Sequence, residues 1–185
     1  MKNKKTPRRT IRRSALAASL AVATAPLAVA HAHDDAGIGR LTGPQTQVIR
    51  TATQAFRDVN TALASGYVAT DECVALPGEG AMGYHFVNPA LASDMNVDPT
   101  LPEVLLYERD ARGRWRLLGV EYFKADADQD LGTTADRPTL FGHAFDGPMP
   151  GHDPQMPAHY DLHVWVFKHN PSGQLAAWNP DVACP

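Results

Sequence analysis

Residues 141–170, FGHAFDGPMPGHDPQMPAHYDLHVWVFKHN, contain five of the eight histidines of the chain. These histidines are His143, His152, His159, His163 and His169. Proline and glycine, which favour loops, crowd the first half of the stretch, whereas aromatic and β-branched residues, which favour strands, dominate the second half. The pattern predicts a stiff loop that leads directly into a β-strand and frames a binding site.

Strand alternation assigns polar residues to faces of the predicted sheet. Successive side chains of a strand point to opposite faces, so Asp161 and His163 share one face of a predicted strand at residues 160–168. The opposite face is apolar and carries Tyr160, Leu162, Val164 and Val166. By the same rule, His85 and Glu121 each lie in the middle of a strand among apolar neighbours. An imidazole or a carboxylate in such surroundings is costly unless it is paired or bound to a metal.

The sequence therefore predicts a divalent-metal site on this face. If the three strands are neighbours, His85, Glu121 and His163 supply two imidazoles and a carboxylate, with His159 as a fourth ligand. This set suits zinc with an open coordination position or non-haem iron, and less specifically copper or manganese. The alternative ligands are His143, His152, His31 and His33. The predicted pocket lies under the loop at residues 141–158, and its walls are Tyr84, Tyr122, Tyr160 and Trp165.

Three hypotheses for function remain open on the sequence. The first is an exported protein that binds a divalent metal without chemistry, and the second is a metal-dependent enzyme with an open coordination position. The third is a metal-free domain that binds small ligands or partners, in which the histidines are ordinary core and surface residues. No HExxH, zinc-finger or GxSxG spacing is present, and the glycines at residues 78–83 lack the Lys-Ser/Thr of a phosphate loop. Catalysis is therefore left undecided.

The N-terminus predicts export. Residues 1–30 have a basic start, a short apolar run and the small-residue end Ala28-Val29-Ala30, which together are typical of a signal peptide. The apolar run is too short for a transmembrane span, which needs about twenty residues. Arg12-Arg13 also fits a twin-arginine pattern, so we expect a secreted or cell-envelope protein that uses the Sec or the twin-arginine route.

The charge of the mature chain limits its partners. The full chain has 17 Lys and Arg residues and 20 Asp and Glu residues, and cleavage after Ala30 removes seven basic residues and no acidic one, leaving −10. This charge argues against nucleic acid and anionic membranes as partners, and by itself it says nothing about cations bound specifically. The partner that we expect is a metal ion or a small molecule. The same cut exposes His31 and His33 near a free amine, a nitrogen set that suits Cu(II), although cleavage after Ala32 removes it. A solvated tail is the simpler interpretation of this end.

The remaining sequence predicts a flexible lead-in at residues 31–40 and one α+β domain at residues 41–185. Apolar residues recur every three or four positions in residues 44–65, which predicts one long helix. Predicted strands cover residues 82–87, 103–109, 115–124 and 160–168, with a weaker one at 139–144. We expect the long N-terminal helix to pack on a curved antiparallel sheet or half-open barrel with long ordered loops.

Two further features have local interpretations. Cys73 and Cys184 are the only cysteines and predict one disulfide in an oxidising compartment, the alternative being a pair of metal-binding thiols. The acidic run Asp126-Ala127-Asp128-Gln129-Asp130 resembles the start of a calcium loop. However, Leu131 replaces the turn glycine and Arg137 replaces the bidentate glutamate, so we interpret the run as a solvated acidic loop, with weak Ca²⁺ binding as the alternative.

Four segments carry a resemblance to known proteins: GAMGYHFVNP, PEVLLY, GVEYF and MPAHYDLHVW, which begin at residues 80, 102, 119 and 156. In these segments the chain resembles a family of uncharacterised exported bacterial proteins. The resemblance covers most of the mature chain and implies a single exported domain. It supplies no activity, ligand or functional residue.

Overall fold

A computed structural model describes residues 39–152 and 156–185 of the chain, and the predicted signal peptide, His31 and His33 lie outside them. The helical elements are α1 Gly43–Thr53, the 3₁₀ helix η1 Gln54–Arg57, α2 Val59–Ala64 and α3 Pro89–Ala92. The strands are β1 Val68–Leu76, β2 Gly80–Val87, β3 Val104–Arg109, β4 Trp115–Ala125, β5 Thr139–Leu140, β6 His143–Ala144, β7 Asp146–Met149 and β8 His159–Val164. Among the described residues, no helix is both long and apolar enough to cross a membrane.

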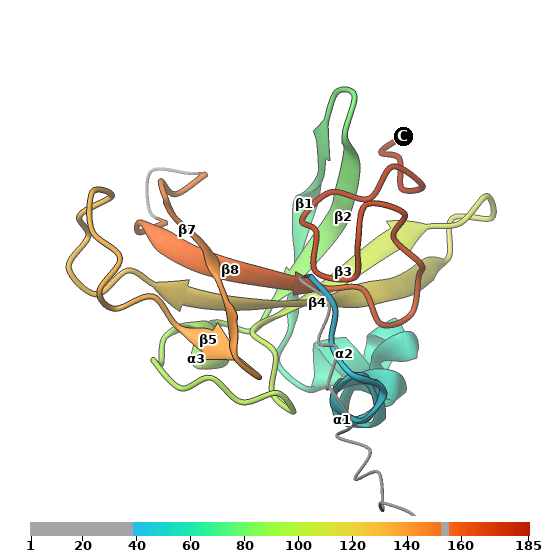
Figure 1. Ribbon diagram of the computed structural model, residues 1–185. Helices are drawn as coiled ribbons and strands as arrows, with labels where there is room; N and C mark the ends of the chain where they lie inside the picture. Colours follow the sequence, from blue (N-terminus) through green and yellow to red (C-terminus); the bar gives the residue numbers. More distant parts are fainter. Residues whose placement is uncertain (1–38, 153–155) are drawn as a thin grey trace, which may run out of the picture. The chain divides into compact units, whose positions relative to one another are not determined.

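The strands form one large antiparallel sheet and one small hairpin. The large sheet has the order β1-β2-β3-β4-β8-β7, and β5 pairs with β6 separately (Figure 1). The predicted α+β class with an antiparallel sheet is therefore confirmed. The sheet does not close into a barrel, because β1 and β7 stand at its two edges and do not pair with each other.

The prediction of one long N-terminal helix is wrong. Thr42 and Gln45 form a capping box at the start of α1, and helical structure continues through η1 only to Arg57. Asp58 is extended, and its carboxylate accepts a hydrogen bond from the N–H of Asn60 at 3.0 Å, which caps α2. The apolar stripe continues across this break, so periodicity alone could not reveal it.

The predicted strands are found with shifted ends, and two strands are additional. β2, β3, β4 and β8 correspond to the four main predictions, and β5 and β6 divide the weak fifth one. β8 ends at Val164, because the N–H of Trp165 then donates to Gln174 of the C-terminal segment at 3.0 Å. β1 and β7 were not predicted, and both contain register irregularities that interrupt simple alternation.

The two faces of the sheet have different covers. α1 and α2 lie on one side (Figure 1), where Ile49 and Ala62 join the main core with residues such as Leu105 and Tyr122. The other face has a smaller apolar cluster of Ala81, Val104, Leu106, Leu118, Phe123, Trp165 and Val182. The C-terminal segment closes part of this second face, because Asn179 and Ala81 exchange backbone hydrogen bonds of 3.1 and 3.2 Å.

The predicted disulfide between Cys73 and Cys184 is confirmed. Their Cα atoms are 5.6 Å apart, and 111 residues separate them in sequence. The bond links β1 to the C-terminal segment, so it fastens the edge strand and the cover of the second face together. Both cysteines are consumed by this bond, which excludes the interpretation of two free metal-binding thiols.

Candidate metal centre

Strand register brings the three predicted ligands onto the second face. Glu121 on β4 lies directly opposite His163 on β8. On its other side, Glu121 lies opposite Val104 of β3, whereas His85 on β2 lies opposite Leu106 of the same strand. His85 therefore reaches Glu121 diagonally across β3.

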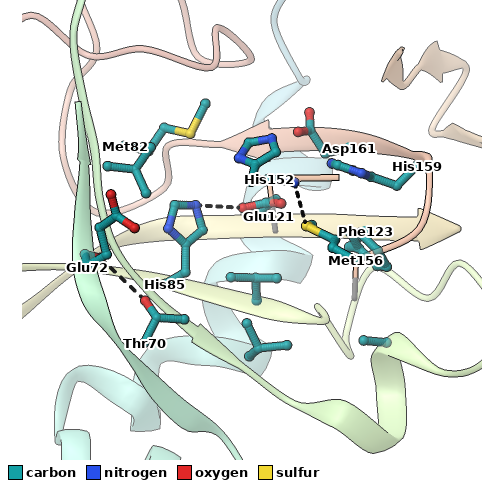
Figure 2. A pocket seen from close by; sticks show the side chains of 14 residues that line it. Thr70, Glu72, Met82, His85, Glu121, Phe123, His152, Met156, His159 and Asp161 are labelled. Carbon is teal, nitrogen blue, oxygen red and sulfur yellow. Dashed lines mark hydrogen bonds and ion pairs between the residues drawn. The ribbon is translucent and has the colours of Figure 1, made fainter. Parts of the chain in front are cut away.

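The ligand atoms converge on a small volume. His85 Nε2 lies 3.1 Å from Glu121 Oε2, and His163 Nε2 lies 3.6 Å from the same oxygen. One donor atom from each of the three residues lies within 4.8 Å of the other two, and Figure 2 shows His85 directed at Glu121. Zinc bonds of 2.0–2.2 Å place tetrahedral ligand atoms about 3.4 Å apart. The three side chains can therefore hold one metal ion.

The donor atoms of Glu121 and His163 are buried. Glu121 is 5% exposed and His163 is fully buried. Within the described part of the chain, Glu121 Oε2 and both ring nitrogens of His163 have no hydrogen-bond partner. Buried polar atoms without partners are costly, and a coordinated cation would satisfy Glu121 Oε2 and His163 Nε2 together.

The alternative partners of Glu121 are occupied elsewhere. Lys124 points to the helix-covered face, where its Nζ lies 2.5 Å from Oε1 of the buried Glu103. Arg116 instead lies 3.1 Å from Asp110 in the turn between β3 and β4. Neither cation therefore pairs with Glu121. The ion-pair contacts of Glu121 are those with His85 and His163.

Asp161 is a component of the site that sequence reasoning did not assign. Its Oδ1 lies 3.5 Å from His163 Nδ1, on the side of the ring away from Glu121. A carboxylate beside the second nitrogen of a histidine is the arrangement that orients many metal-bound imidazoles. The sequence feature that could have assigned Asp161 to the site is its position two residues before His163, on the same face of the strand.

Without a metal, the charges of the cluster hold His163 protonated. Burial by itself disfavours the imidazolium, but Glu121 and Asp161 outweigh burial and raise the pKa of His163 to about 9. Burial also disfavours the Glu121 carboxylate, yet His163 and His85 outweigh it and lower the pKa of Glu121 to about 2. The metal-free site is thus a buried ion pair at neutral pH.

This ion pair predicts a pH dependence for the metal-free protein. The contribution of His163 is complete below its unfolded pKa of about 6.5 and is lost as pH rises through 9, roughly 3 kcal/mol in total. We expect urea denaturation in the presence of a chelator to show the free energy of unfolding falling from pH 6.5 to 9. A His163→Leu variant should lack this component, and an equal fall in that variant would contradict the assignment.

A cavity of about 370 Å³ opens beside the ligands. Its lining includes His85 and Glu121, together with His159, Asp161 and the apolar side chains of Met82 and Phe123 (Figure 2). The remaining lining residues are Thr70, Glu72, Val74, Val87, Ala92, Val104, His152 and Met156. The cavity is therefore walled by β1, β2, β3, β4 and β8, by the end of α3 and by the loop before β8.

His159 lies in the cavity wall but outside the three-ligand group. Its ring packs on Phe123 with centroids 4.9 Å apart, and its Nδ1 lies 3.2 Å from the carbonyl oxygen of Pro157. Burial lowers the pKa of His159, which favours a neutral imidazole. His152 is exposed, with its ring centroid 5.5 Å from that of His159, whereas His143 lies in the separate hairpin.

The four aromatic residues predicted as pocket walls lie elsewhere. Tyr122 and Tyr160 are buried in the main core on the helix-covered face, and Tyr84 packs against that core. Residues adjacent in a strand face opposite sides, so Tyr84, Tyr122 and Tyr160 point away from the neighbouring site residues. Trp165 follows the end of β8, and its Nε1 donates to the carbonyl of Ala176 at 2.6 Å.

Comparisons with known proteins supply no function for the site. No model of a known protein family matches the chain, and no curated protein or solved structure matches it.

Proposed function

We propose that this protein is exported and binds one divalent transition-metal ion through His85, Glu121 and His163. The observation that supports this proposal is the convergence of three donor groups, two of which, Glu121 and His163, have buried atoms without a hydrogen-bond partner among the described residues. A cluster that served only as an ion pair would satisfy these atoms with aligned hydrogen bonds.

Zinc fits the donor set best. Two imidazoles and one carboxylate form a recurrent zinc ligand set, and the distances from Glu121 Oε2 of 3.1 and 3.6 Å bracket the tetrahedral spacing. Ferrous iron accepts the same two-histidine, one-carboxylate set, and copper binds imidazole with higher intrinsic affinity. The ligand set thus favours a borderline cation over Mg²⁺ or Ca²⁺.

A metal-dependent enzyme is the second candidate, and the cavity favours it. Three protein ligands leave a zinc ion one coordination position, and the His85 side chain is 15% exposed beside the cavity. His159 and Asp161 line the same cavity and are within the class of groups that move protons in catalysis. A visible spectrum of the Co²⁺-substituted protein that changes on adding azide would support the open position.

Export is supported by the composition of residues 1–30, as described from the sequence. The Cys73–Cys184 disulfide is compatible with an oxidising compartment outside the cytoplasm.

Metal analysis tests the proposed binding directly. We expect the untagged protein, secreted with its native signal and dialysed, to retain about one ion per chain, and His85→Ala/His163→Ala to weaken binding at least about 100-fold. The matched control is His143→Ala/His169→Ala, which removes two histidines outside the site and should retain the ion. Absence of metal from the wild-type protein even after loading with Zn²⁺ would overturn the proposal. If both double variants retain the same amount of metal per chain, the ion binds at a site other than His85, Glu121 and His163.

A further inference from the structure

A second group of carboxylates lies at the end of β4, away from the cavity. Asp126 directly follows this strand, and Asp128 and Asp136 belong to the loop after it. One carboxylate oxygen from each of the three residues lies within 4.8 Å of the other two. None of these residues lines the histidine-bearing cavity.

The interpretation of a solvated loop fails at Asp126. This residue is only 2% exposed, and neither of its carboxylate oxygens has a hydrogen-bond partner in the described part of the chain. Burial and the carboxylates of Asp136 and Asp128 raise the pKa of Asp126, which means that these surroundings destabilise its anionic form. A buried carboxylate directed at two others needs a proton or a cation.

The flanking carboxylates are already held in position. Asp136 accepts hydrogen bonds from the N–H of Ala127 at 2.8 Å and from the hydroxyl of Tyr160 at 2.9 Å. Asp128 accepts from the N–H of Asp130 at 2.9 Å and from the hydroxyl of Thr133 at 2.7 Å. These bonds fix both side chains around Asp126 while using only part of the lone-pair capacity of each carboxylate.

We propose that Asp126, Asp128 and Asp136 form a calcium-binding site. The donors are all oxygen, which hard cations prefer, and Ca²⁺–O distances of 2.3–2.6 Å allow ligand oxygens up to about 5 Å apart in one shell. Water or loop carbonyls complete the six to eight ligands that Ca²⁺ takes. The sequence comparison with a calcium loop was rejected on Leu131 and Arg137, and it did not consider Asp136, which the fold brings to Asp126 from ten residues further along the chain.

Such an ion would stabilise the strand that carries part of the transition-metal site. Asp136 is bonded to Tyr160 of β8, and Asp126 donates its backbone N–H to the carbonyl of Ala158 at 2.8 Å. The ion therefore joins the end of β4 to the start of β8, three residues before His163. This calcium site does not depend on the proposed transition-metal function.

Thermal unfolding tests the calcium site. Metal-free protein is prepared with a chelator, and CaCl₂ is then added to the wild type, Asp126→Asn, Asp128→Asn and the matched control Asp130→Asn. We expect Ca²⁺ at about 100 times its dissociation constant to raise the Tm of the wild type and the control by about 5 °C. Asp126→Asn should show no such rise, and Asp128→Asn should bind Ca²⁺ at least about 10-fold more weakly by calorimetry.

In the presence of a chelator, the effect of Asp126→Asn on the Tm is expected to be reversed. Because Asp126→Asn removes a buried anion, its Tm without Ca²⁺ should equal or exceed that of the wild type. The Ca²⁺ shift should persist in His85→Ala/His163→Ala, which separates this proposal from the transition-metal site. Two results would overturn it: a wild-type Tm that Ca²⁺ does not raise, or a rise that survives in both Asp126→Asn and Asp128→Asn.

Discussion

Replacing His163 with leucine is expected to lower the free energy of unfolding of the metal-free protein by about 3–5 kcal/mol. His163 is fully buried, and its Nε2 lies 3.6 Å from the buried Glu121 carboxylate. Leucine fills a similar volume but leaves His85 as the remaining histidine beside the Glu121 carboxylate. Most of the cost therefore comes from a buried carboxylate that has lost its counter-charge, and not from a cavity.

A double-mutant cycle separates these contributions. The second variant is Glu121→Leu, and the third is His163→Leu/Glu121→Leu, all measured by urea denaturation at pH 6 with a chelator. Since a well-packed apolar pair can replace a buried ion pair at little cost, the double variant should recover much of the stability lost in His163→Leu. A double variant that loses the sum of the two single effects would show that the residues are not coupled.

This cycle also bears on why the cluster exists. Val104, Leu106 and Phe123 surround it on the same face, so an apolar replacement has suitable neighbours. If the apolar double variant is stable but binds no metal, the histidines and the carboxylate serve binding and do not serve folding. That result would agree with the buried atoms of Glu121 and His163, for which residues 39–152 and 156–185 supply no hydrogen-bond partner.

Removing the disulfide is expected to have an effect of similar size. A bond that closes a loop of 111 residues restricts the unfolded chain, and its loss in Cys73→Ser/Cys184→Ser should cost about 5 kcal/mol in the chain-entropy model. The folded protein would keep the sheet, because β1 also pairs along β2 and Asn179 still pairs with Ala81. The variant should therefore fold with a lower midpoint in urea.

The measurement compares the oxidised wild type with the double serine variant in urea at constant pH. The reduced wild type, which lacks the bond but keeps both cysteine side chains, is the control for the two changes from cysteine to serine. An increased slope of free energy against urea would accompany the more expanded unfolded chain. A midpoint that does not change would mean that the C-terminal segment contributes little to the stability of the fold.

Part of the site was accessible from the sequence because strand alternation is a local property of the backbone. The side chains of an extended chain alternate between two faces, so the sequence alone places His163 on one face of its strand and the apolar Leu162 and Val164 on the other. The isolated positions of His85 and Glu121 among apolar neighbours carried the same information. Two cysteines in a chain predicted to be exported likewise left one simple pairing.

Strand order, register and long-range contacts were decided only by the tertiary structure. Whether His85 and Glu121 meet depends on β3 lying between their strands, and whether Asp136 joins Asp126 depends on the path of a loop. The break at Asp58 was equally hidden, because the apolar stripe continues on both sides of it. Periodicity reports which face a side chain occupies, whereas ligand distances of 3–4 Å depend on pairing between segments far apart in the chain, which no local pattern specifies.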